Sequence, residues 1–179
     1  MSTIIRTHVA FAAVGAGLIH LALVVGSPPP LAVAFALVGA AELVWGVAAM
    51  AAPRLPLPRV AFAGALLPTL LWAAVLLAEV ALGTPATGGA ASLPLLPLAA
   101  ASALGLFCAA VLGVRLRRSA PPAPRPVPGA ARYLVGLFAG ALVVASITTP
   151  ALAATEAGRY AHPHGEHSVI VDPHHGDHR

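Results

Sequence analysis

The chain has 179 residues, of which 59% are hydrophobic and 9% charged, whereas about 25% of residues are charged in an ordinary soluble domain. Its length leaves no room for both a multi-helix membrane body and a separate soluble domain of about 50 residues or more, which excludes an ATPase or dinucleotide-binding domain. The formal net charge of +4 comes from arginines placed mainly between apolar segments, which argues against nucleic acid as a partner. The composition predicts an integral membrane protein.

Five stretches are long and apolar enough to form membrane-spanning helices, each of which needs about 20 residues. Breaks rich in proline and glycine separate them, for example Pro28-Pro29-Pro30 after the first. We therefore predict an all-α bundle of five transmembrane helices in residues 1–154 and a largely disordered tail in residues 155–179. The predicted spans are 8–26, 31–52, 60–82, 93–114 and 133–153.

The arginines predict the orientation of this bundle. Arg6 precedes the first span, Arg54 and Arg59 separate the second and third, and five more arginines lie between the fourth and fifth, whereas the other two loops carry no charge. Because positively charged loops stay in the cytoplasm, we expect a multi-pass protein of the bacterial inner membrane with a cytoplasmic N-terminus and an extracytoplasmic C-terminus. The five-arginine loop can also contact anionic lipid headgroups.

The tail after Ala161 holds six of the eight histidines, with three carboxylates among them. Imidazole and carboxylate are ligands for Zn, Ni, Co or Cu(II), and the tail lacks the Cys and Met that Cu(I) prefers. The short spacings, broken by proline and glycine, let neighbouring side chains converge on one ion. Protonation should weaken binding below about pH 6.5. The predicted ligands are His162, His164, His167, His174, His175, His178, Glu166, Asp172 and Asp177.

Other interpretations of the tail stay open. A disordered soluble tail binds metal weakly whenever it is rich in histidine, and clustered histidines can also sense pH. The fifth span and its alanine-rich end resemble a secretory signal with a cleavage site. Cleavage after Ala153 or Ala154 would release the tail outside the cell.

Three ionisable residues fall inside the predicted spans, at a cost of roughly 2.5–3.5 kcal/mol each on insertion scales. Counting along the spans places Glu79 near the outer surface, His20 in the outer half and Glu42 near the midplane. They are candidates for a polar path that holds a cation or passes a proton. The alternative is that protonated, hydrogen-bonded glutamates only fix the helix packing.

The leading functional hypothesis is a small membrane protein that binds a divalent transition metal at its outer tail and takes part in metal uptake, delivery or homeostasis. This layout resembles accessory or permease components of bacterial metal-uptake systems, but no family motif matches residue by residue. The alternative is a structural or assembly subunit that contacts a partner membrane protein or another copy of itself. No nucleophile–base pair or cofactor motif points to an enzyme, and the lone Cys108 excludes a Cys-x-x-Cys site.

Overall fold

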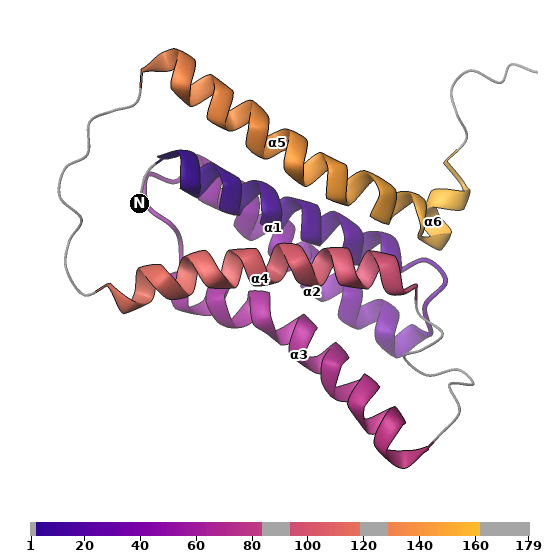
Figure 1. Cartoon of the computed structure of the whole chain (residues 1–179). Helices are drawn as coiled ribbons and strands as arrows, with labels where there is room; N and C mark the ends of the chain where they lie inside the picture. The colour runs from indigo at the N-terminus through magenta and orange to yellow at the C-terminus, as the bar shows by residue number, and fades with distance from the viewer. Residues whose placement is uncertain (1–2, 84–93, 119–128, 162–179) are drawn as a thin grey trace, which may run out of the picture.

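The computed structural model describes residues 3–83, 94–118 and 129–161, and these residues contain helices and no strand. Five helices are long and apolar enough to cross a membrane, which confirms the predicted all-α architecture. They alternate in direction along one axis (Figure 1). The helices are α1 (Thr3–Leu23), α2 (Pro29–Ala51), α3 (Pro58–Leu82), α4 (Leu95–Arg117), α5 (Ala130–Ala153) and the short α6 (Glu156–Arg159).

The observed helix ends differ from the predicted span ends by a few residues. Helix α1 begins at Thr3 instead of residue 8, because its first polar turn is still helical, with the Thr7 hydroxyl donating to the Thr3 carbonyl. Prolines start α2 and α3, where their missing N–H costs nothing. Helix α6 lies in the segment predicted to begin a largely disordered tail, so the first residues after α5 are ordered.

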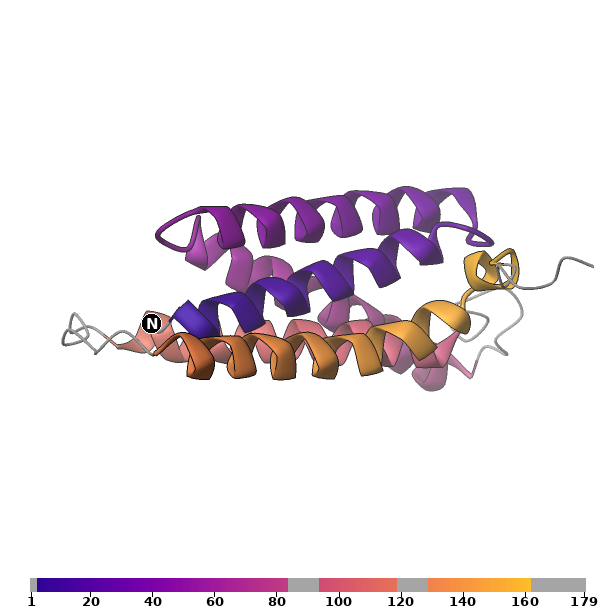
Figure 2. The same cartoon turned by 90° about the horizontal axis from the view of Figure 1, so that it is seen from above.

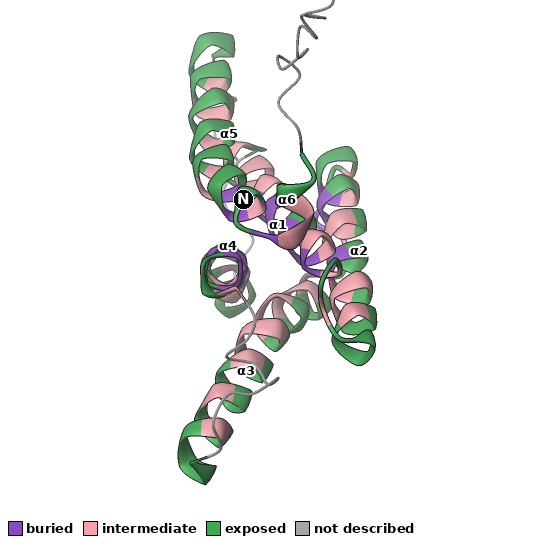
Figure 3. Cartoon of the chain, turned by 90° about the vertical axis from the view of Figure 1, so that its right-hand side faces the viewer, coloured by how far each residue is buried: buried purple, intermediate pink, exposed green. Residues whose placement is uncertain are grey.

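Helix α1 occupies the centre of the bundle. It packs against α2, α4, α5 and α6, and it lies between α2 and α5 when the molecule is seen from above (Figure 2). Burial follows this arrangement. In the most apolar 18-residue stretch of each helix, 50% of the residues are buried in α1 and 44% in α4, but none in α3. Helices α1 and α4 therefore form the core, and α3 and α5 diverge from it (Figure 3).

Glycines bring α1 and α2 into backbone contact. A Cβ atom added to Gly17 would lie 2.8 Å from the Gly39 carbonyl oxygen, and one added to Gly39 would lie equally close to the Gly17 carbonyl oxygen. Small residues allow such an approach, and van der Waals packing drives helix association in membranes, where no hydrophobic effect operates between helices. Gly46 makes a similar contact with the backbone of α1 farther along the same interface.

Two side chains fix the loop between α2 and α3. Arg6 Nη1 donates hydrogen bonds to the carbonyl oxygens of Ala52 and Pro53, at 2.7 and 2.8 Å. Trp45 Nε1 donates to the Pro56 carbonyl oxygen at 2.8 Å. Carbonyl groups that follow a helix lack intrahelical partners, so these bonds satisfy them and hold α1 to the end of α2.

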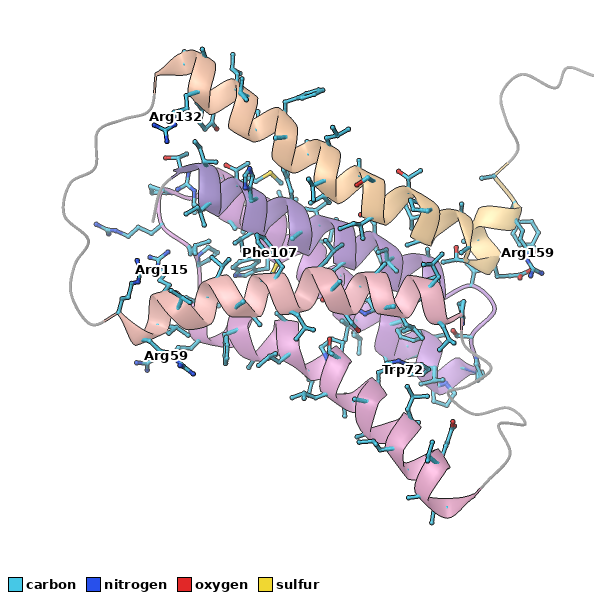
Figure 4. All side chains as sticks on the ribbon, viewed as in Figure 1. Arg59, Trp72, Phe107, Arg115, Arg132 and Arg159 are labelled. Carbon is cyan, nitrogen blue, oxygen red and sulfur yellow. The ribbon has the colours of Figure 1, made fainter. Side chains whose placement is uncertain are left out.

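Charge is separated between the two ends of the bundle. Seven of the eight arginines in the described part of the chain lie at the end where α1, α3 and α5 begin, whereas Arg159 lies at the opposite end (Figure 4). The three described glutamates lie elsewhere, in α2, α3 and α6. We call the first end the arginine-rich end and the second, which carries α6, the tail end. The arginine-rich end contains Arg6, Arg54, Arg59, Arg115, Arg117, Arg118 and Arg132.

Replacing Gly39 with alanine should destabilise the bundle by about 1–3 kcal/mol, because the added methyl group meets the α1 backbone and forces the helices apart. The matched control is Gly64→Ala on α3, where nothing lies within 4 Å of the added Cβ. Unfolding both variants in mixed detergent micelles with a rising share of denaturing detergent measures the difference in their free energies of unfolding. Equal stability of the two variants would contradict the close packing of α1 and α2.

Candidate functional site

A histidine and a glutamate meet inside the apolar bundle. His20 Nδ1 lies 2.7 Å from Glu42 Oε2, and the two side chains are 5% and 13% exposed. Their hydrogen bond joins the last turn of α1 to the middle of α2. The structure therefore brings together two of the three ionisable residues predicted within the spans. We call them the His20–Glu42 pair.

The packing of α1 against α2 explains why these residues meet. The Glu42 Cβ lies 3.3 Å from the position that a Cβ on Gly17 would occupy, so the carboxylate starts beside the α1 backbone and extends toward the next turn, where His20 lies. The His20 ring is also stacked on Phe35 of α2, with ring centroids 6.0 Å apart and planes 19° apart. Helix α2 therefore contacts the imidazole twice, with Phe35 against the face of the ring and Glu42 at its Nδ1 edge.

Burial gives the hydrogen bond its importance. Removing a polar group from water destabilises the fold unless the group is hydrogen-bonded, and burying an unpaired charge destabilises it much more. The pair can exist as neutral imidazole and neutral carboxyl or as imidazolium and carboxylate, and its net charge is zero in both cases. Such a pair can therefore stay inside an apolar bundle in either form.

Two further ionisable groups within the spans, Glu79 and Cys108, come from the other helices α3 and α4. Glu79 lies in the last turn of α3, the part of that helix that diverges from the bundle (Figure 1). The Cys108 thiol donates to the Val9 carbonyl oxygen at 3.4 Å, as expected for a small packing residue. Across the described ranges, no three His, Cys, Asp or Glu side chains form a group able to hold a metal ion. The proposed path through His20, Glu42 and Glu79 is therefore not one shared metal site.

Nearer the arginine-rich end, His8 lies against α5. Its Nε2 is 2.7 Å from the Gly136 carbonyl oxygen, and Gly140 leaves room for the ring, because a Cβ at that position would overlap it. This contact links α1 to α5. The sequence gives no signal for it, since both groups lie within apolar runs and the pairing depends on how the helices cross.

Helix α6 attaches the base of the tail to the bundle. Thr155 caps the helix by accepting a hydrogen bond from the Gly158 amide at 3.1 Å, and it donates to the Leu152 carbonyl oxygen at 2.7 Å. Gly26, which has a φ of +83°, leaves room for the Glu156 side chain, since a Cβ at Gly26 would lie 3.1 Å from the Glu156 Cβ. A threonine followed by a glutamate is a helix-start signal that the sequence analysis missed.

The last described residue, Ala161, lies at the tail end, immediately after α6. All nine predicted tail ligands fall outside the described residues. These are His162, His164, Glu166, His167, Asp172, His174, His175, Asp177 and His178.

No family model, curated protein or solved structure matches the chain. The interpretation of its chemistry therefore depends on its own residues. The described residues form an all-helical bundle with five helices able to span a membrane, and the His20–Glu42 pair joins two ionisable side chains inside it.

Truncating either partner of the pair should leave the other buried and unpaired. We expect His20→Leu and Glu42→Leu each to destabilise the protein by about 3–5 kcal/mol, and the double variant to cost less than the sum of the two. Detergent unfolding of the wild type, both single variants and the double variant measures this coupling. Strictly additive losses would show that the two side chains do not interact.

Proposed function

We propose that the protein is a bacterial inner-membrane protein that binds a divalent transition metal at its extracytoplasmic tail and takes part in metal uptake, delivery or homeostasis. One observation carries this proposal. Helix α6 fixes the chain to the end of the bundle opposite the arginine-rich end, and the histidine-rich sequence begins at the next residue after Ala161. A concentrated set of metal ligands is thus joined to a defined face of the bundle.

The separation of charge supports the outward orientation. At the arginine-rich end, loops and helix ends that are far apart in the sequence lie together. None of the described carboxylates lies at this end. Under the positive-inside rule this end faces the cytoplasm, where its arginines attract anionic lipid headgroups. The tail end then faces outward, where incoming metal ions arrive.

Ligand chemistry supports the choice of metal. Imidazole and carboxylate suit Zn, Ni, Co and Cu(II), and their binding requires deprotonated histidine. The tail sequence supplies six imidazoles and three carboxylates within eighteen residues, enough for one complete coordination sphere of four to six ligands.

A second function, that of a structural or assembly subunit, has its own supporting observation. The divergent helix α3 has no buried residue, and its apolar side chains are exposed over most of its length, with Leu77 69% and Val80 81% exposed. A lipid-facing helix needs no other cover, but a partner membrane protein or a second copy also fits this surface. A partner that co-purifies in fixed ratio, together with no metal retained, would favour this function.

The orientation predicts which end of the bundle is labelled from outside. Single cysteines at Ala161 and Ala131, in a Cys108→Ser background, place exposed thiols at the tail end and the arginine-rich end. A membrane-impermeant maleimide should label Ala161→Cys on intact cells, and Ala131→Cys only after the cells are permeabilised. The reverse pattern would place the tail in the cytoplasm and overturn the proposed outward capture.

The tail histidines should carry tight metal binding. Replacing all six with asparagine should abolish tight, stoichiometric binding of Zn, Ni, Co or Cu(II), whereas His8→Asn should leave it unchanged, because His8 is held against α5. Titration of the purified proteins and elemental analysis provide the measurement. Binding by the intact protein should also fall below about pH 6.5, as the histidines protonate. Equal binding by the intact and six-asparagine proteins would contradict the proposal.

A further inference from the structure

We propose that the His20–Glu42 pair is a second metal-binding site, inside the bundle, that takes the same class of divalent ion as the tail. The inference rests on the proposed function for the identity of the ion, but its evidence comes from the described residues. The ion binds His20 Nδ1 and the Glu42 carboxylate, and the proton that these groups share leaves to water. One divalent ion enters and one proton leaves to water, so the site changes from a neutral hydrogen-bonded pair to a metal complex with a charge of +1.

The geometry of the pair is close to that of two ligands on one metal ion. Zinc lies about 2.0–2.2 Å from histidine nitrogen and carboxylate oxygen, so two ligand atoms in tetrahedral coordination are separated by about 3.3–3.5 Å. The observed separation is 2.7 Å, the length of a charge-assisted hydrogen bond. An opening of about 0.6–0.8 Å between these two atoms converts the hydrogen-bonded pair into a chelating pair.

The imidazole is already oriented for such a role. Metal-binding histidines work best when surrounding groups fix the ring, and here the ring is buried and stacked on Phe35. The described arginines lie near the helix ends, and the Glu42 carboxylate pairs with His20. Among the described residues no arginine pairs with this carboxylate, so its negative charge is available to a divalent ion.

The His20–Glu42 pair also lies toward the tail end of the bundle. His20 is three residues from the end of α1, at Leu23, and α6 packs against α1 at the same end. The histidine-rich sequence therefore begins, after Ala161, at the same end of the bundle as His20. The pair supplies two ligands, fewer than a structural zinc site, which needs four, so it should bind more weakly than the tail and release its ion more readily.

The test uses the full-length protein in which the six tail histidines are asparagine, so that the tail no longer masks the internal site. Titration with Co²⁺, followed by its visible absorption, should show one ion per chain, bound at least about tenfold more weakly than by the intact protein. His20→Asn and Glu42→Gln in this background should each weaken the remaining site at least about tenfold, since even the loss of an outer-shell group costs 10–100-fold. His8→Asn and Glu156→Gln are matched controls that should leave it unchanged.

A further variant separates metal ligation from a purely structural role. His20→Cys keeps a metal ligand but loses the imidazole, so Co²⁺ binding in the same background should persist and gain a sulfur-to-cobalt charge-transfer band. If the six-asparagine protein binds no Co²⁺ while the intact protein does, the internal site is wrong and the tail site stands. If the intact protein also binds none, the proposed function fails. A site that survives both pair substitutions, or a His20→Cys variant without the sulfur band, would overturn the inference.

Discussion

The backbone contact between α1 and α2 is the constraint on which the rest of the structure depends. Because Gly17 and Gly39 have no side chains, the two helices approach so closely that the carbonyl oxygen of each glycine lies where a side chain on the other would be. That approach sets the register of the helix pair, and the register in turn brings Glu42 to His20 and lets Arg6 reach the end of α2. A bulkier residue at either glycine would disturb the polar contacts together with the packing.

Polar contacts and apolar packing have different roles in this bundle. Leucine and valine side chains on the outer faces of α2, α3 and α5 are largely exposed, and in a membrane they contribute little to holding one helix against another, because lipid is as apolar as they are. The hydrogen bonds of His20 and Arg6 are directional, so they select one arrangement of α1 and α2. The divergent end of α3 has no comparable buried contact among the interactions described above, which agrees with its exposure.

Much of the fold could be predicted from the sequence, because apolar runs of about 20 residues and the prolines between them identify membrane helices directly. The contact between His20 and Glu42 could only be raised as a possibility, since it depends on which faces of two helices meet. The short helix α6 was missed although Thr155 and Glu156 form a recognisable helix start. The hydrogen bond between His8 and Gly136 has no local signal, because every residue carries a backbone carbonyl and the sequence does not show which one will accept a hydrogen bond. The tail ligands stay predictions, since they lie outside the described residues.

The number of ligands at each proposed site sets the order in which metal ions would move. A site that passes an ion onward must bind strongly enough to be occupied and weakly enough to be emptied. The tail, with nine potential ligands in its sequence, suits capture from dilute solution, whereas a pair with one imidazole and one carboxylate suits brief occupancy. Burial increases this contrast, because an ion held by two protein ligands in an apolar bundle is poorly solvated and is readily passed to any acceptor that completes its coordination. The incompleteness of the His20–Glu42 pair is therefore the property expected of a transfer site, and it distinguishes that site from one built for storage.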